Sequence, residues 1–88
     1  MTIDQPLLEF PCDFPIKAMG KSENDFDALV VEIVRKHCPD LFEGAVKSRL
    51  SKAGNYVSVT VTIHARSRSQ LDNIYFDLTA HEKVLIAL

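Results

Sequence analysis

The most constraining feature of this 88-residue chain is an unbroken alternation of apolar and polar side chains over residues 55–65. Successive side chains of a β-strand point to opposite faces, so this pattern predicts a strand with one buried face. A parallel strand covered on both faces would be apolar throughout, so we expect the central strand of an antiparallel sheet that is open on one side. The side chains expected on the buried face are those of Val57, Val59, Val61, Ile63 and Ala65.

Three further segments predict strands. Residues 14–19 alternate, and Gly20 is expected to end that strand. Residues 45–50 alternate as well, and the short glycine-containing connection to the central strand predicts an antiparallel hairpin. Residues 84–88 are apolar on both sides, which predicts a last strand that is covered or that meets a partner.

Two segments carry apolar residues at helical spacing. The first covers residues 24–38, and either Ser22 or Asn24 can cap the helix that it predicts. The second, residues 67–80, begins at a capping box formed by Ser67 and Gln70, with Ser69 as an alternative cap. The chain therefore alternates between strands and helices.

The order strand, helix, strand, strand, helix, strand predicts one ferredoxin-like α+β domain over residues 14–88. Right-handed crossovers place both helices on one face of a four-stranded antiparallel sheet with strand order 4-1-3-2. Residues 1–13 are expected to form an extended lead-in, with Leu7, Leu8 and Phe10 packed on the edge of the domain.

Composition excludes several classes of partner. The chain is 47% hydrophobic and 25% charged, which is ordinary for a globular domain, and its net charge of −2 gives no overall attraction to nucleic acid or anionic membranes. No apolar run is long enough to span a bilayer, and Asp4, Pro6 and Glu9 interrupt the region where a signal peptide would lie. We expect a cytoplasmic protein with neither nucleic-acid nor membrane partners.

Residue types that carry catalysis are sparse and scattered. Cys12 and Cys38 lack the spacing of a metal-binding pair, and free thiols are their expected state. His37, His64 and His81 fall at a helix end, on a strand and after a helix, with no ligand partner at metal-binding spacing. We therefore expect no enzymatic activity, no metal and no cofactor.

The turn from the first strand into the first helix is the strongest candidate for a small-molecule site. Free N–H groups, the positive end of the helix dipole and nearby ammonium groups all favour a negative charge there. An ordinary strand-to-helix turn is the alternative. The residues expected to hold a carboxylate-bearing metabolite are Lys17, Gly20, Lys21, Ser22 and Asn24.

The face of the sheet without helices is a second candidate surface. Alternation places basic and polar side chains on it, among them Lys47, Arg49, Tyr56 and His64. Such a face suits an anionic ligand or a second copy of the sheet. Single-stranded RNA would need two or three stacking aromatics, and only Tyr56 is available. A solvated face with scattered charges is the alternative.

Four stretches of the chain resemble the YbeD-like family of small bacterial proteins, also called UPF0250 or DUF493. They are LLEFP at 7–11, FPIKAMG at 14–20, VVEIVRKHCP at 30–39 and GNYVSVTVTIHA at 54–65. Members are often labelled lipoate regulatory proteins and resemble the ACT-type regulatory domains that bind amino acids. The resemblance implies an ACT-like fold and a regulatory or small-molecule-sensing function connected with lipoate metabolism, and it supplies no catalytic residue.

Two classes of function therefore remain open: a regulatory domain that senses a small metabolite, and a protein-interaction adaptor that works without a ligand. A last strand at the sheet edge would expose unpaired backbone groups, so a homodimer through the sheet edge or the open face fits either class. A ligand at residues 20–24 favours the sensor. An apolar surface around Leu85 and Ala87 that binds a partner favours the adaptor.

Overall fold

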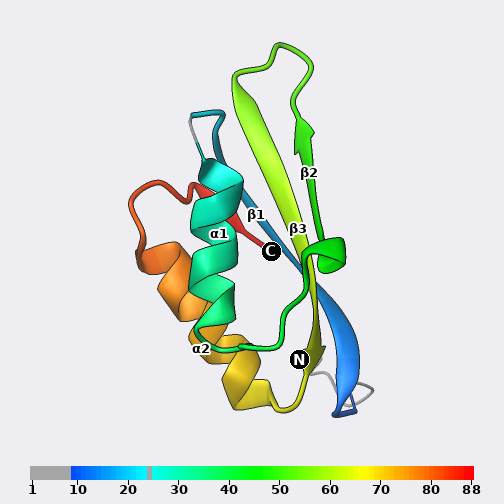
Figure 1. Ribbon diagram of the computed structural model, residues 1–88. Helices are drawn as coiled ribbons and strands as arrows, with labels where there is room; N and C mark the ends of the chain where they lie inside the picture. The colour runs from blue at the N-terminus through cyan, green and yellow to red at the C-terminus, as the bar shows by residue number, and fades with distance from the viewer. Residues whose placement is uncertain (1–8, 24) are drawn as a thin grey trace.

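The alternating stretch forms β3, Tyr56–Ala65, in the middle of the sheet. Its apolar side chains from Val59 to Ala65 are buried. β1, Cys12–Lys21, runs antiparallel beside it along its full length, from Cys12 opposite Ala65 to Lys21 opposite Tyr56. The computed structural model describes residues 9–23 and 25–88, and within these ranges β1 and β3 form the longest pairing of the sheet (Figure 1).

Two shorter strands complete the sheet. β2, Val46–Leu50, pairs with the outer side of β3, and β4, Ile86–Ala87, pairs with the outer side of β1. Every pairing is antiparallel. The spatial order is β2-β3-β1-β4, which is the predicted 4-1-3-2 read from the opposite edge.

Both helices lie on the same face of the sheet, as Figure 1 shows. α1, Phe26–Arg35, and α2, Arg68–Ala80, turn their apolar stripes toward the inner side chains of β1 and β3. The core that results contains Ile16, Val30, Val59, Ile74 and Leu78, each fully buried or nearly so. The ferredoxin-like α+β fold predicted from the sequence is confirmed.

The helices leave β2 uncovered. In Figure 1 this strand lies at the edge of the sheet, and neither helix crosses over it. Val46 is half-buried, and the other four residues of β2 are exposed on both faces. The two-layer sandwich is therefore incomplete at one edge.

The expectation that Gly20 ends the first strand was wrong. β1 starts earlier and ends later than predicted, and Gly20 is a buried position within it. A Cβ added there would lie 2.5 Å from Cε1 of Phe26 and 2.6 Å from the carbonyl oxygen of Lys83. Gly20 is needed because a ring and a loop backbone pack directly on the strand, not because the chain turns there.

The start of α1 also differs from the prediction. Asp25 is the N-cap residue, with a left-handed φ of 64° and no side-chain cap bond. Ser22 does not cap the helix, since its hydroxyl donates to the carbonyl of Gly54 in the β2–β3 hairpin. Asn24, the other predicted cap, lies outside the described residues, as do Leu7 and Leu8 of the lead-in. Phe10 packs against the core as expected.

Three other element boundaries differ from those predicted from the sequence. α1 ends at Arg35 and not at Cys38, because the N–H of His37 donates to the carbonyl of Val34 three residues back, as in a turn. β2 begins one residue late, after a short 3₁₀ helix at Glu43–Ala45. β4 has only two residues, because Val84 is still in a turn that bonds to His81.

The predicted N-terminal cap of α2 is present, but one of its two hydrogen bonds has a different partner. Ser67 is the N-cap and its hydroxyl accepts from the backbone N–H of Gln70 at 3.1 Å. The side-chain oxygen of Gln70 accepts from the N–H of Arg66 at 2.7 Å, one residue before the position that a capping box uses. Neither α1 nor α2 has the length and apolar character that a membrane crossing requires, and the same holds for the rest of the described chain.

Candidate functional site

A hollow of about 560 Å³ opens where the end of β1, the start of α1 and the loop between α2 and β4 meet. The first two segments are joined by the β1–α1 turn, and the pairing of β4 with β1 brings the α2–β4 loop, far away in the sequence, next to them. The residues that line the hollow are Lys21, Glu23, Asp25, Phe26, Leu29, His81, Glu82, Lys83 and Leu85.

Backbone hydrogen bonds fix the α2–β4 loop over β1. The loop starts with two tight turns, in which His81 donates to the carbonyl of Leu78 and Val84 donates to the carbonyl of His81. Leu85 then donates to the carbonyl of Met19 at 2.8 Å. Because these bonds involve the backbone, the position of the loop does not depend on the identity of most of its side chains.

The apolar part of the hollow is built by three side chains. Phe26 is buried, and its ring lies against the strand at Gly20. Leu29, one helical turn further along α1, is half-buried, whereas Leu85 is more than half exposed. The hollow therefore offers apolar surface that water still reaches.

The charged part of the hollow contains both signs. The ammonium of Lys83 lies 3.0 Å from a carboxylate oxygen of Glu23, which joins the α2–β4 loop to the β1–α1 turn. The hydrogen bond and charge of Lys83 lower the pKa of Glu23 below its usual value, and Lys21 adds a smaller effect in the same direction. Asp25 and Glu82 add two more carboxylates. A ligand that carries both a carboxylate and a cationic or hydrogen-donating group matches this lining better than a multiply charged anion does.

The five residues predicted to hold a ligand fall in different places. Lys21 lines the hollow, and Gly20 lies buried next to it under Phe26. Ser22 faces the β2–β3 hairpin, and Lys17 lies on the helix-free face, outside the lining. Asn24 is outside the described residues.

Sequence reasoning missed the contribution of the α2–β4 loop. Nothing in the run from His81 to Lys83 marks it as part of a site. The usable signal was the predicted strand order, which put the last strand beside the first and so brought the preceding loop near the β1–α1 turn.

The helix-free face carries the side chains that alternation placed on it. In one cross-strand row Lys47 of β2 lies opposite Thr60, which lies opposite Lys17. In the next row Arg49 lies opposite Ser58, which lies opposite Met19. Ile86 of β4 extends the second row, so the basic face ends in apolar side chains at the β4 edge.

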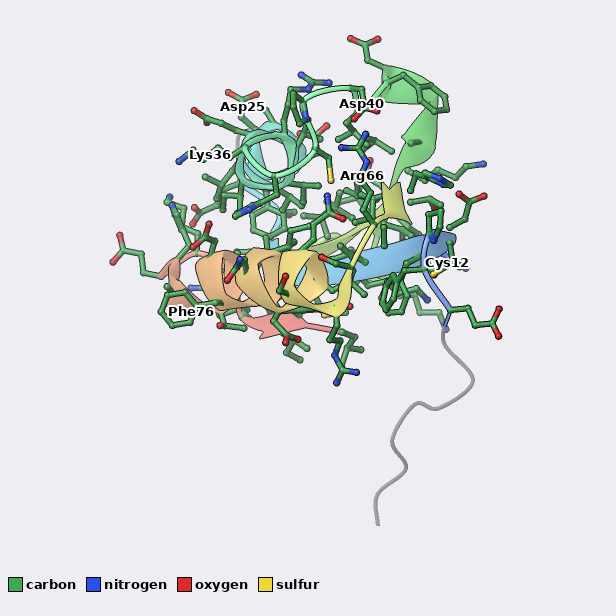
Figure 2. The ribbon with its side chains drawn as sticks, turned by 90° about the horizontal axis from the view of Figure 1, so that it is seen from below. Cys12, Asp25, Lys36, Asp40, Arg66 and Phe76 are labelled. Atoms are coloured by element: carbon green, nitrogen blue, oxygen red, sulfur yellow. The ribbon has the colours of Figure 1, made fainter. Side chains whose placement is uncertain are left out.

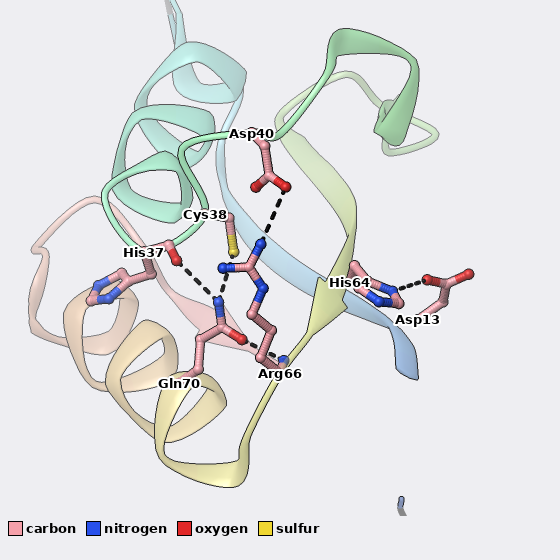
Figure 3. Close-up of polar contacts among 7 residues, drawn as sticks. All are labelled: Asp13, His37, Cys38, Asp40, His64, Arg66 and Gln70. Carbon is pink, nitrogen blue, oxygen red and sulfur yellow. Dashed lines mark hydrogen bonds and ion pairs between the residues drawn. The ribbon is translucent and has the colours of Figure 1, made fainter. Parts of the chain in front are cut away.

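The other two predicted residues of this face lie at opposite ends of β3. Tyr56 is opposite Lys21, and Nδ1 of His64 lies 3.1 Å from a carboxylate oxygen of Asp13 (Figure 3). Both members of the His64–Asp13 pair are largely exposed. An exposed pair of this kind contributes little to stability, and it brings no nucleophile with it.

A second polar cluster joins the ends of the two helices (Figure 3). The side-chain nitrogen of Gln70 donates to the carbonyl of His37 at 3.0 Å and contacts Sγ of Cys38 at 3.4 Å. Nε2 of His37 lies 2.6 Å from a carboxylate oxygen of Asp77 on α2. The sequence placed His37 at a helix end, and in the structure its side chain links the end of α1 to α2.

Cys38 has the environment of a structural thiol. It is buried, and burial raises its pKa, with the charge of Asp40 as a smaller cause. A thiol with a raised pKa is a poor nucleophile at neutral pH. Cys12 and Cys38 are both free thiols, and no three His, Cys, Asp or Glu side chains of the described ranges gather as metal ligands would.

Comparison with known proteins identifies close relatives. A family model described as "Protein of unknown function (DUF493)" matches residues 5–88. A UPF0250 protein of Chromobacterium violaceum is 49% identical over 84 residues, which cover 96% of this chain and 94% of that protein. A UPF0250 protein of Paraburkholderia phytofirmans is 46% identical over 87 residues, covering 99% of this chain and 98% of that one. The solution structure of protein HP0495 from H. pylori superposes with a TM-score of 0.71 at 17% identity, over 96% of this chain and 88% of that one, and it supports the fold alone.

Proposed function

We propose that this chain, which belongs to the UPF0250 (DUF493) family, is a non-catalytic regulatory domain that binds a small carboxylate-bearing metabolite in the hollow beside β1 and β4. The observation that carries the proposal is the lining of the hollow. It combines the apolar surface of Phe26, Leu29 and Leu85 with the ammonium group of Lys21, at the β1–α1 turn where the sequence predicted a ligand.

The chemistry of the lining supports binding and not turnover. Enzymes lower barriers by many kcal/mol, which requires a nucleophile, an acid–base pair or a metal directed at one point. The hollow offers a single ion pair, exposed carboxylates and His81, whose ring nitrogen accepts from the N–H of Lys83. A turnover abolished by replacing His37, His64 or Cys38 would contradict the non-catalytic assignment.

A thermal-shift experiment tests the ligand. Amino acids, lipoate and octanoate are added to the wild type, to Lys21→Ala and to Lys36→Ala, a matched control on the exposed end of α1. A ligand at 100 times its dissociation constant stabilises a protein by about 2.7 kcal/mol, which shifts the melting temperature measurably. We expect one carboxylate to stabilise the wild type and Lys36→Ala, with a smaller shift for Lys21→Ala. The resemblance to proteins labelled lipoate regulatory proteins is the reason for including lipoate and octanoate.

The alternative function, a protein-interaction adaptor without a ligand, is favoured by a different observation. Leu85, Ile86 and Leu88 are each about half exposed or more, at the β4 edge where an apolar surface was predicted to meet a partner. A homodimer through this edge would also close the hollow. If no carboxylate shifts the melting temperature and Leu85→Ser abolishes a dimer measured by light scattering, the adaptor replaces the sensor.

A further inference from the structure

The outer edge of β2 presents backbone groups that are free to pair. In an antiparallel ladder, N–H and C=O groups point alternately toward and away from the neighbouring strand. The N–H of Ser51 donates to the carbonyl of Tyr56 at 2.8 Å, so the groups of Arg49 and Lys47 also point toward β3. The N–H and C=O groups of Ser48 and Leu50 therefore point outward, and they bond to no other segment of the described chain.

A groove runs between this edge and α1, because no helix covers β2. Two adjoining hollows of about 680 and 330 Å³ form it, and Ser48 lines both. We call it the β2–α1 groove. Its apolar lining consists of Phe26, Ala28, Val31, Val46, Leu50 and Val57. Leu50 is 62% exposed, so the groove leaves a large apolar side chain at the sheet edge in contact with water.

The opposite face of the same strand is basic. Lys47 and Arg49 point to the helix-free side, are exposed, and take part in no ion pair with residues 9–23 or 25–88. β2 thus has two cations on one face and apolar side chains on the other. Lys17 on β1 lies on the basic face as well, in the same cross-strand row as Lys47.

Charge excludes a second copy of this chain from the edge. An antiparallel β2–β2 pair with Ser48 opposite Ser48 places Lys47 opposite Arg49 of the other copy, and a pair with Ser48 opposite Leu50 places Arg49 opposite the Arg49 of that copy. Like charges directly opposite each other across a strand pair are destabilising. Basic residues on an edge strand are a common device against self-association, and they also select for partners of opposite charge.

We propose that β2 docks an extended segment of a partner protein whose carboxylate side chains, two residues apart, lie opposite Lys47 and Arg49. The segment would add a fifth strand through Ser48 and Leu50, and the apolar side chains between its carboxylates would enter the β2–α1 groove. In this register the two charged positions are non-hydrogen-bonded pairs, whose side chains lie closest together. The proposal does not depend on a metabolite in the hollow beside β4.

A peptide selection on the wild-type protein tests this directly. A random library of peptides of about ten residues, long enough for a strand, is selected on the immobilised chain, and the enriched peptides are synthesised. We expect Asp or Glu at alternate positions with apolar residues between them. In a titration with the peptide followed by NMR, the amide resonances of Ser48 and Leu50 are expected to shift, together with that of Val31 across the groove.

Charge reversal supplies the matched control. Lys47→Glu/Arg49→Glu is expected to raise the dissociation constant of the selected peptide by about tenfold or more, because two attractive pairs become repulsive. Lys36→Glu/Arg68→Glu makes the same change in net charge at exposed positions at the end of α1 and the start of α2, where Arg68 has only an exposed ion pair with Asp72, and it is expected to alter the constant by less than about twofold. All four residues are exposed, so both variants are expected to keep the wild-type melting temperature.

Several results would overturn the proposal. They are a selection that enriches no peptide, enriched peptides without alternating carboxylates, shifts confined to residues outside β2 and the groove, and equal affinity for Lys47→Glu/Arg49→Glu. N-methylation of the peptide at the amides that face Ser48 and Leu50 must also weaken binding, because the added strand forms through these backbone bonds.

Discussion

At the scale of single residues, Gln70 makes contacts that its predicted role in a capping box does not account for. It completes the cap of α2 and bonds to both His37 and Cys38 at the end of α1. Each net hydrogen bond contributes about 1 kcal/mol, so Gln70→Ala is expected to lower the free energy of unfolding by about 1–3 kcal/mol. Urea unfolding measures this. Asn73→Ala, an exposed change on the same helix, is the control, and an equal loss in both variants would contradict the role of Gln70.

The two cysteines differ in reactivity for reasons that the structure gives. Cys38 is buried and its pKa is raised, whereas Cys12 is half-exposed at the start of β1. Alkylation proceeds through the thiolate, so at pH 8 iodoacetamide is expected to label Cys12 well before Cys38. Mass spectrometry of peptides over time gives the order. Labelling of Cys38 first would show that its surroundings open more readily than its burial implies.

The pH dependence of the Glu23–Lys83 pair has a definite sign. The folded-state pKa of Glu23 is lowered below its usual 4.5, so its ionised form stabilises the fold above that pH, and this contribution is lost as the pH falls through the folded-state pKa. Glu23→Gln is therefore expected to be less stable than wild type at pH 7, with the difference shrinking below pH 4.5. Denaturation midpoints at pH 7 and pH 3 measure the difference. A gap of the same size at both values would rule out the linkage.

At the scale of elements, α1 starts from an unfavourable residue. Asp25 is its N-cap in the left-handed region, at φ 64°, and its side chain makes no cap bond. Glycine adopts this conformation without steric cost, so Asp25→Gly is expected to raise the free energy of unfolding by about 0.5–1 kcal/mol. Asp27→Gly, inside the first turn, is expected to lower it by about 1 kcal/mol. Thermal denaturation of both variants checks the two signs, and a loss at both positions would show that the Asp25 side chain stabilises the fold.

The elements that sequence predicted best are those whose periodicity and burial coincide. The alternation over residues 55–65 predicted the central strand to within one residue, and of the two serines considered, Ser67 is the cap of α2. Gly20 was misread because a glycine that accommodates a neighbouring ring has the same sequence appearance as a glycine in a turn. The α2–β4 loop and the open groove beside β2 depend on how elements far apart in sequence pack together, which local patterns do not encode.

At the scale of the whole molecule, two helices cover a four-stranded sheet unequally. They pack over β1, β3 and β4 and leave β2 with a basic face, an apolar face and an unpaired edge (Figure 1). In the view of Figure 2, Phe76 projects from α2 into solvent on the side of this helix away from α1. The domain has its two candidate binding regions on either side of the start of α1.

The position of Phe26 couples the affinities of these two regions for their ligands. Its ring lies in the lining of the hollow beside β4 and also in that of the β2–α1 groove, as do Glu23 and Asp25. A metabolite that displaces this ring or these carboxylates changes the surface that a docked segment meets. Linkage then requires reciprocity: whatever factor the metabolite applies to the affinity for the segment, the segment applies to the affinity for the metabolite. Phe26, whose ring lies against Gly20, and the carboxylates of Glu23 and Asp25 are the shared side chains through which such cooperativity would act.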